Sequence, residues 1–402
     1  MKKKRIVFFS LFIVCIVVVA IAATYFMGKN KEKADTVNEF GFESDFKCSS
    51  KKVDLETMNF KAEKNGSHED MNDGFAMSED GIYYFVDDYL KFYDYSSKKK
   101  VIVCNKPNCK HDNKECNAFY EDDVAEKGFM DSLTINYYEG YLYMAGCDDD
   151  GKVYLYRISK DGSSREKYMQ LYGANFTDVG RQGETEDFSR TWIVPNIVIR
   201  NGYVYYMFTS DDTCSGLMRK KLGSDKVEYV VKAKDDMHFQ AYRFVSNGDY
   251  LLFQVGVYNE DYTNMDAALY ALNDTTDEIV KLVDDFQGRY YMRDDCMYYL
   301  KYREGLYRYS FSDGKTKKIL PAKYCSGEVV VNKNSILCFN VGELVKEYDL
   351  EGNLLKEHEK FGYLHCKNGD YIVASKKGKM EEGGSGYLLL DIDTYEAVEE
   401  LD

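Results

Sequence analysis

The chain has 402 residues and a formal net charge of −15, and it contains 37 tyrosines but only 3 prolines. An acidic surface of this kind repels anionic polymers, so nucleic acid is excluded as an expected partner. Aromatic and β-branched residues recur in short runs between Gly, Asp and Asn, which is typical of strands joined by tight turns. We therefore expect an all-β fold.

The amino-terminal residues predict a membrane anchor. Residues 1–5 form a basic flank with four basic side chains, and residues 6–27 are an uncharged apolar run. As a helix this run of 22 residues would be about 33 Å long, enough to cross a bilayer. The basic flank is expected in the cytoplasm, so the rest of the chain lies outside as the ectodomain of a single-pass cell-membrane protein.

Two further expectations follow from this topology. Without the four basic residues of the flank, the formal charge of the outer part is −19. Residues 28–57 are polar, mixed in charge and without a clear period, which predicts a linker that holds the folded domain off the membrane. The alternative to an anchor is a signal peptide cleaved near the small residues 20–22, although its apolar core would be unusually long.

One pattern recurs seven times over residues 58–402. Each copy has a turn with Gly or Asn, an aromatic-rich strand, a loop, a strand resembling Leu-Tyr-x-Tyr-Asp, a tight turn and a short closing strand. The copies start near residues 81, 140, 202, 248, 295, 334 and 369, a spacing typical of four-stranded propeller blades. Each twisted sheet buries both faces only against neighbouring blades, which favours a closed ring.

The predicted fold is therefore a seven-bladed β-propeller of four-stranded blades. A two-sheet sandwich is the alternative, but it would need nearly thirty strands in one pair of layers, counting about four strands for each copy of the repeat.

A cysteine-rich insert follows the first copy of the repeat. It reads Cys104-x-Lys-Pro-x-Cys109-x-His111 and continues to Cys116-Asn-Ala. Together with the tyrosine-rich repeat, this insert resembles that of bacterial cell-surface β-propellers without an assigned activity, and the resemblance covers nearly all of the ectodomain. It implies a propeller at the cell surface.

The strands are more distantly similar to propellers of the low-density-lipoprotein-receptor type. Their blades carry a Tyr-Trp-Thr-Asp signature, which Tyr83-Tyr84-Phe85 matches in part. The only tryptophan, Trp192, lies outside the repeat, so every copy departs from that signature.

The insert also holds a candidate metal site. Cys104, Cys109, His111 and Cys116 offer three sulfur ligands and one imidazole, which can complete a tetrahedral Zn²⁺ site, although their spacing is not a common zinc pattern. Outside the membrane, a disulfide between two of the three cysteines explains the motif equally well, and unpaired thiols are a third interpretation. No other cofactor is predicted.

No motif predicts a catalytic residue. The five histidines lack a His-Glu-x-x-His spacing, and residues 383–386 do not form a nucleophile elbow. Residues 310–316 resemble an Asp-box but are expected to be a hairpin turn. These features favour a binding, sensing or scaffold module for a protein, peptide or glycan over an enzyme. The alternatives are a carbohydrate-active hydrolase or lyase with carboxylates at the central channel, or a structural subunit of a membrane complex.

The expected binding face is the one that carries the long loops. Strand order places the loops between blades, and those between second and third strands, on one face. Long excursions are expected there over residues 104–132, 172–196 and 257–267, whereas the opposite face has tight turns. The second excursion contains four aromatic residues suited to a sugar ring or a partner surface, unless they only pack the loop onto its blade. They are Tyr172, Phe176, Phe188 and Trp192.

Overall fold

A computed structural model describes most of the chain after residue 39. The described residues are 40–49, 58, 74–86, 88–113, 115–119, 135–147, 153–171, 197–211, 214–232, 239–258, 265–284, 286, 290–293, 295–301, 303–325, 328–332, 334–339, 344–358, 364–367, 370–376 and 386–402. Within these ranges, no helix has the length and apolar character that a bilayer crossing requires. The span predicted over residues 6–27 lies outside them.

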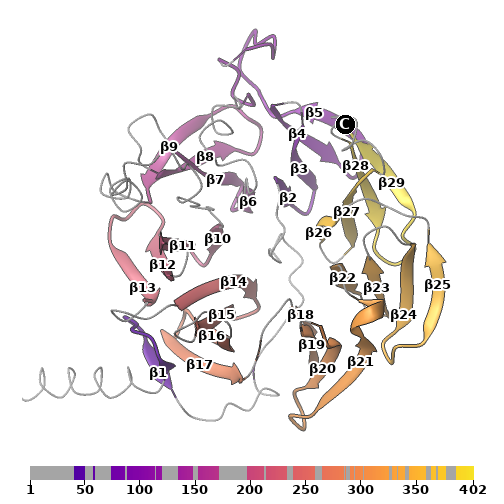
Figure 1. Cartoon of the computed structure of the whole chain (residues 1–402). Helices are drawn as coiled ribbons and strands as arrows, with labels where there is room; N and C mark the ends of the chain where they lie inside the picture. The colour runs from indigo at the N-terminus through magenta and orange to yellow at the C-terminus, as the bar shows by residue number, and fades with distance from the viewer. Residues whose placement is uncertain are drawn as a thin grey trace, which may run out of the picture.

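Strands β2 to β29 form seven antiparallel four-stranded blades around a ring, which confirms the predicted fold (Figure 1). A short parallel pairing of β12 with β14 joins the sheets of blades 3 and 4, and the sheets of the other five blades are separate. Within each blade the first strand lies nearest the centre and the fourth lies at the rim. The first three blades are β2 (Phe75–Met77), β3 (Gly81–Val86), β4 (Tyr89–Asp94) and β5 (Lys99–Ile102); β6 (Ile135–Tyr138), β7 (Tyr141–Cys147), β8 (Val153–Ser159) and β9 (Arg165–Gln170); β10 (Ile197–Arg200), β11 (Tyr203–Asp211), β12 (Cys214–Lys221) and β13 (Val227–Val231). Blades 4 and 5 are β14 (Phe239–Asn247), β15 (Tyr250–Tyr258), β16 (Met265–Asn273) and β17 (Glu278–Val283); β18 (Tyr290–Met292), β19 (Cys296–Lys301), β20 (Gly305–Ser310) and β21 (Thr316–Pro321). Blades 6 and 7 are β22 (Glu328–Val331), β23 (Ser335–Phe339), β24 (Val345–Asp349) and β25 (Leu354–His358); β26 (Leu364–Lys367), β27 (Tyr371–Ser375), β28 (Tyr387–Asp391) and β29 (Ala397–Leu401).

A polar residue at the end of the third strand explains the last position of the repeated Leu-Tyr-x-Tyr-Asp motif. Asp349 Oδ1 accepts hydrogen bonds from the backbone N–H groups two and four residues later, at 3.0 and 2.8 Å. Asn273 accepts two such bonds at 3.0 Å each, and Asp391 accepts two at 3.0 and 2.8 Å. These side chains close the tight turn that leads into the fourth strand.

Every pair of neighbouring blades encloses its own apolar cluster among the described residues. Between blades 1 and 7, for example, Phe75 and Tyr84 pack with Leu389 and Leu401, and each of these residues is at most 1% exposed. Each sheet therefore buries both faces, as the repeat predicted.

The ring closes between blades 7 and 1 without a shared strand, because their two sheets are separate. Besides the apolar cluster, lysines of blade 1 bind the end of the chain. Lys91 Nζ donates to the Asp402 carbonyl at 3.0 Å, and Lys100 Nζ donates to the Glu400 carbonyl at 2.9 Å. We call this junction the seam.

Residues 40–49 are part of the folded domain, so the linker predicted over residues 28–57 is wrong for this segment. Strand β1 (Lys47–Ser49) pairs in parallel with β17 at the outer edge of blade 4. Phe42 is 1% exposed and packs edge to face on Tyr270, with ring centroids 5.3 Å apart. We call residues 40–49 the N-terminal strap.

Arg219 of β12 fixes the strap to blades 3 and 4. Its guanidinium carbon lies 4.3 Å from the ring centroid of Phe46 and 4.3 Å from that of Tyr203. The same group forms ion pairs with Glu228 at 2.9 Å and Asp277 at 2.8 Å. One cation thus joins the strap and both blades, because it stacks on rings and binds carboxylates at once.

A second arginine joins the same two blades from inside. Arg200 of β10 pairs with Asp274, which follows β16, at 2.8 Å, and both side chains are at most 6% exposed. Arg200 also donates to Ser246 Oγ at 3.0 Å, and Tyr205 donates to Asp274 at 3.2 Å. The buried charges are therefore hydrogen-bonded as well as paired.

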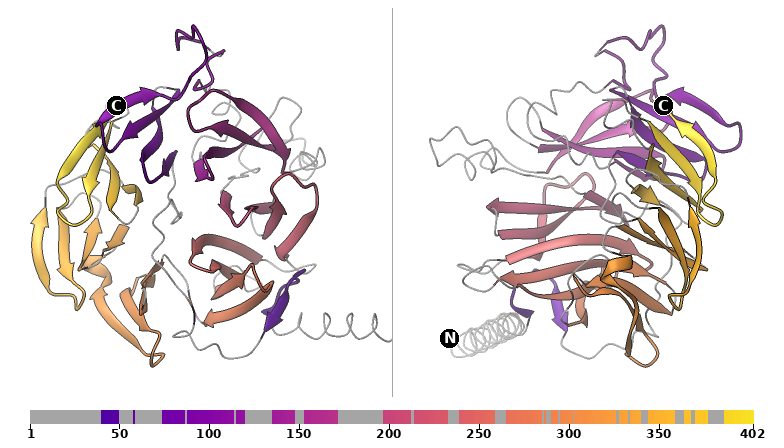
Figure 2. Two further views of the ribbon diagram at one scale, coloured as in Figure 1. Left: turned by 180° about the vertical axis from the view of Figure 1, so that it is seen from behind. Right: turned by 45° about the vertical axis from the view of Figure 1, so that its right-hand side comes forward.

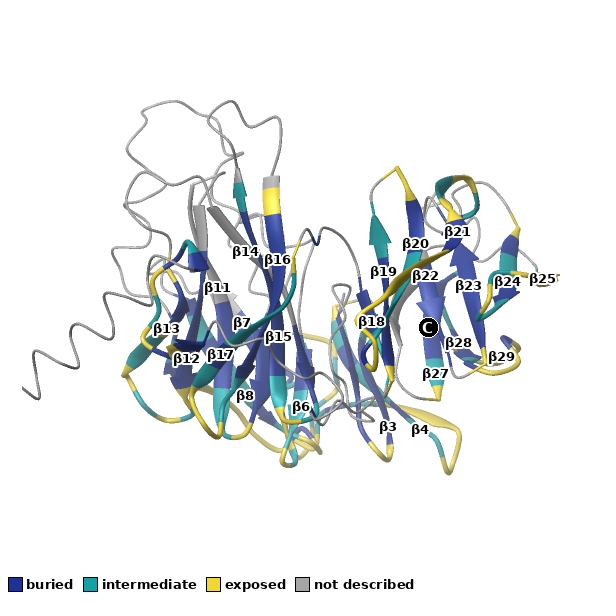
Figure 3. Cartoon of the chain, turned by 90° about the horizontal axis from the view of Figure 1, so that it is seen from below, coloured by how far each residue is buried: buried dark blue, intermediate teal, exposed yellow. Residues whose placement is uncertain are grey.

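The two faces of the ring differ in their connections (Figure 3). Turns between first and second strands, and between third and fourth strands, are short throughout, as at residues 139–140 and 274–277. On the opposite face, residues 171–196 connect β9 to β10, and residues 103–134 connect β5 to β6. The excursion predicted over residues 257–267 is too long, because β15 and β16 extend the ladder and leave only residues 259–264 to connect them.

Candidate functional site

The cysteine-rich insert projects outward from the rim of the ring, between blades 1 and 2 (Figure 2). Its described residues leave β5 at residue 103 and return along blade 1. There the Leu90 N–H donates to the Ala118 carbonyl at 2.9 Å, and Tyr89 and Phe119 form an isolated antiparallel bridge. The Val103 N–H donates to the Leu90 carbonyl at 2.9 Å, so both ends of the insert are tied to the start of β4.

The base of the insert also presses against the hairpin turn between β8 and β9 of blade 2. The Gly162 carbonyl accepts hydrogen bonds from the Asn105 N–H at 3.3 Å and from Asn117 Nδ2 at 2.9 Å. Gly162 has φ +69°, and a Cβ there would lie 2.2 Å from the Val103 carbonyl oxygen. Only glycine fits this close approach without a shift of the chain.

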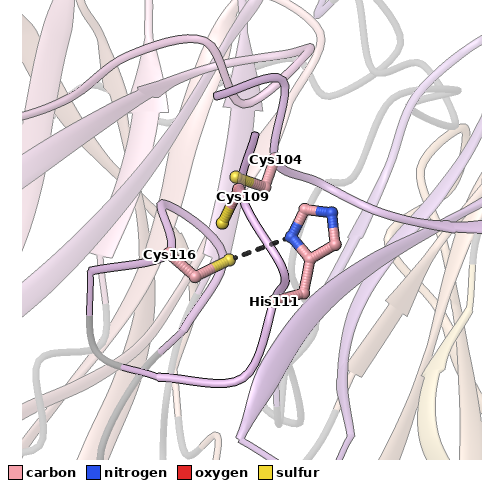
Figure 4. Close-up of side chains that lie close together, drawn as sticks. All are labelled: Cys104, Cys109, His111 and Cys116. Atoms are coloured by element: carbon pink, nitrogen blue, oxygen red, sulfur yellow. Dashed lines mark hydrogen bonds between the residues drawn. The ribbon is translucent and has the colours of Figure 1, made fainter. Parts of the chain in front are cut away.

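The structure brings the four predicted ligands together (Figure 4). One ligand atom from each of Cys104, Cys109, His111 and Cys116 lies within 4.8 Å of all the others. His111 Nδ1 lies 3.3 Å from Cys116 Sγ, and all three thiols are free. Cys116 is buried, and the other three side chains are partly buried. This group could hold a metal ion.

Left-handed backbone conformations turn the chain so that these side chains converge. Asn108 has φ +61° and His111 has φ +55°. Asparagine and histidine occur in this region more often than most residues, but any non-glycine residue there carries a strain of about 1–3 kcal/mol that its surroundings must offset. Lys106 Nζ donates to the Glu115 carbonyl at 2.8 Å and closes the loop beneath the cluster.

Burial and hydrogen-bond donors shift the pKa values of Cys104 and Cys116 in opposite directions. Partial burial raises the pKa of Cys104, but N–H donors from Lys106 and Asn117, together with the neighbouring thiols, outweigh it and lower the pKa. Burial raises the pKa of Cys116 to about 12, and a hydrogen bond to Cys104 and the negative charge of that neighbour add to the effect. The environment therefore favours one thiolate and opposes a second unless a cation joins it.

The predicted aromatic binding residues, Tyr172, Phe176, Phe188 and Trp192, lie outside the described residues, so their role stays a prediction.

Two cysteines outside the insert, Cys296 and Cys338, are 1% and 0% exposed and pack as small apolar side chains in the cluster between blades 5 and 6. Residues 310–316 form the predicted hairpin turn, in which the Ser310 N–H donates to the Lys315 carbonyl at 3.0 Å.

Sequence reasoning missed the partners of the cluster in blade 2. The Asp161-Gly162 pair marks a turn in the sequence, but nothing in it indicates that the turn faces the insert. Arg165 Nη1 donates to the Phe119 carbonyl at 2.7 Å, and the sequence does not indicate this contact either.

No protein-family model matches the chain, and no curated protein matches it in sequence. Solved structures match at low similarity. A computationally designed protein, Ika8, has 10% identity and a TM-score of 0.41, over 83% of this chain and all of its own length. BamB from Moraxella catarrhalis has 11% identity and a TM-score of 0.43, over 85% of this chain and 91% of its own. A PL25 ulvan lyase, solved with a GlcA-Rha3S saccharide, has 10% identity and a TM-score of 0.46, over 80% and 93%. The propeller assignment rests on the strand pairing itself.

Proposed function

We propose that this protein is a binding, sensing or scaffold module, anchored in the cell membrane by residues 6–27 with its propeller outside the cytoplasm. Its ligand or partner is a protein, peptide or glycan. The observation that supports this proposal is the difference between the two faces of the ring, where short turns on one face oppose long connections on the other. Long loops on a rigid framework carry function more often than they serve as simple connections.

The framework is suited to this role because every blade is packed on both faces. A ring held by an apolar cluster at each junction keeps its loops in fixed positions. A binding surface that is ordered before the partner arrives loses less conformational entropy on association. The acidic ectodomain favours ligands that are neutral or basic over anionic polymers.

The binding proposal is tested with full-length protein in nanodiscs, probed against peptide and glycan arrays. A variant with Ala at Tyr172, Phe176, Phe188 and Trp192 is expected to lose at least about tenfold in affinity for array ligands, with an unchanged Tm. The control variant carries Ala at Asp225, Ser312 and Glu396, three exposed residues of the short-turn face, and is expected to bind normally. Normal binding by the first variant and loss in the control would contradict the assignment.

The topology is tested on intact cells that express the chain with a tag before Met1. Added protease is expected to remove propeller epitopes while the tag stays protected, because the basic flank holds that end in the cytoplasm. A soluble mature form that lacks residues 1–22 would mean that the segment is a cleaved signal peptide.

A further inference from the structure

We propose that Cys104, Cys109, His111 and Cys116 bind one Zn²⁺ in a closed tetrahedral site that holds the insert against the junction of blades 1 and 2. The site lies in the connection from β5 to β6 on the long-loop face, but it does not depend on the ligand that this face binds.

The spacing of the donor atoms fits such a site. In tetrahedral zinc, with Zn–S about 2.3 Å and Zn–N about 2.0–2.1 Å, neighbouring ligand atoms lie about 3.5–3.8 Å apart. Here all four donor atoms lie within 4.8 Å of one another, and the His111 Nδ1 to Cys116 Sγ distance is 3.3 Å. Changes of about 1 Å or less in these distances bring the geometry to that of the occupied site.

The donor set selects the metal. Three thiolates and one imidazole are soft ligands, which favour Zn²⁺ and disfavour Ca²⁺ and Mg²⁺, whose ligands are oxygens. All four positions are filled by protein side chains, so no position is open for water or substrate. A closed site of this kind is structural rather than catalytic.

Hydrogen bonds beside the ligands hold their backbone in place. The Asn105 N–H and Asn117 Nδ2, next to Cys104 and Cys116 in the chain, both donate to the Gly162 carbonyl, at 3.3 and 2.9 Å. Contacts of this kind around a metal site fix the orientation of its ligands. The buried Cys116 belongs to the apolar cluster between blades 1 and 2, which keeps water from that side of the site.

The insert has little else to fold it. Of its described residues only Val103, Cys116 and Ala118 are buried, and it contributes a single bridge to a sheet. A disulfide would use two of the three sulfurs and leave the third thiol and the imidazole beside it without a role. A metal ion uses all four groups.

The first test measures metal in full-length protein purified in mild detergent with reductant and without added metal. One zinc per chain is expected, and zinc-edge X-ray absorption should show three sulfur neighbours and one nitrogen at about 2.3 and 2.0 Å. Replacement by Co²⁺ should give the intense visible bands of a tetrahedral thiolate site. This measurement needs no variant, so a misfolded mutant cannot obscure it.

The second test compares two variants. His111→Ala is expected to weaken zinc binding by more than about 100-fold, since even loss of a residue that only supports a ligand costs 10–100-fold. Cys325→Ser is the matched control, because that buried thiol lies between β21 and β22, far from the insert in the ring, and donates to the Pro321 carbonyl at 3.5 Å, a bond that a hydroxyl can replace. It is expected to keep its zinc.

The inference is overturned by wild-type protein that holds less than about a tenth of an equivalent of zinc and gives no cobalt spectrum. It is equally overturned if cells treated with N-ethylmaleimide before lysis yield a chain in which two of the three cysteines form a disulfide.

Discussion

Two junctions of the ring carry a segment that lies outside the blade pattern, and they hold it by different chemistry. At the junction of blades 3 and 4 the N-terminal strap contributes buried Phe40, Phe42, Phe46 and Cys48 and a strand paired with β17. At the junction of blades 1 and 2 the insert contributes few buried apolar groups but four soft ligand atoms. A segment with its own apolar side chains docks by excluding water, whereas one without them needs a cross-link.

The largest expected effect comes from the buried ion pair at the junction of blades 3 and 4. Arg200→Met leaves the 1% exposed Asp274 side chain without its cation and should lower the free energy of unfolding by about 3–5 kcal/mol. Lys47→Met is the control, because it breaks a pair with Glu278 in which the lysine is 71% exposed, worth about 0–1 kcal/mol. Chemical denaturation measures both, and similar losses would contradict the importance of burial.

The next effect tests how much the apolar side chains of the strap contribute to its docking. Phe42→Ala removes a ring that is 1% exposed and should cost about 3 kcal/mol. Hydrogen exchange should accelerate in residues 40–49 and β17 and stay unchanged in the insert, whether or not a chelator is present. Faster exchange in the insert would show that the two junctions are coupled.

A smaller effect is expected at the junction of blades 1 and 2. Gly162→Ala places a Cβ 2.2 Å from the Val103 carbonyl oxygen, at a residue with positive φ. The free energy of unfolding is expected to fall by about 2–3 kcal/mol, and the zinc content should fall as well. Gly140→Ala has a similar φ of +82° with nothing within 4 Å of the added carbon, so it isolates the conformational cost of about 1 kcal/mol. Equal Tm values for the two variants would argue against a close contact between insert and blade 2.

The smallest effect concerns the turns between third and fourth strands, which recur around the ring. A change in one of these turns should not alter the stability of one junction relative to the other. A hydrogen bond from Asn353 holds the pKa of Asp349 below its usual range, and the Thr394 N–H does the same for Asp391. A lowered folded-state pKa adds stability above the unfolded value of about 3.9, and this is lost as pH falls through the folded value. Asp391→Asn, which gives blade 7 the residue type that blade 4 carries at Asn273, should flatten the decline of Tm below about pH 4. An unchanged acid decline would contradict this role.

The sequence predicted the ring because its second and third strands are long, tyrosine-rich and bounded by Gly or Asn turns. The innermost strands gave no comparable signal. β2 and β18 have three residues each, too few to display an alternating pattern. Their position in the ring follows only from the strands that they pair with.

The strap and the Cys/His cluster also differ in how far the sequence predicts them. Phe40, Phe42, Phe46 and Cys48 all lie at even positions, a period of two that mixed charges between them concealed. The four ligands were recognisable because they lie within one short loop. Their attachment to Gly162 was not, because it depends on how blades 1 and 2 pack together and no local pattern reports that.

The seam has a consequence for the order of folding. Because no strand is shared there, each blade can pair its own strands from a contiguous stretch of chain at low contact order. The contacts of Lys100 with Glu400 and of Lys91 with Asp402 join residues 300 and 311 positions apart and carry a large loop-closure entropy, so we expect them to form last. Before they form, the row of blades would be an open arc whose two end faces expose the apolar side chains of the seam, and we expect chains in that state to aggregate most readily.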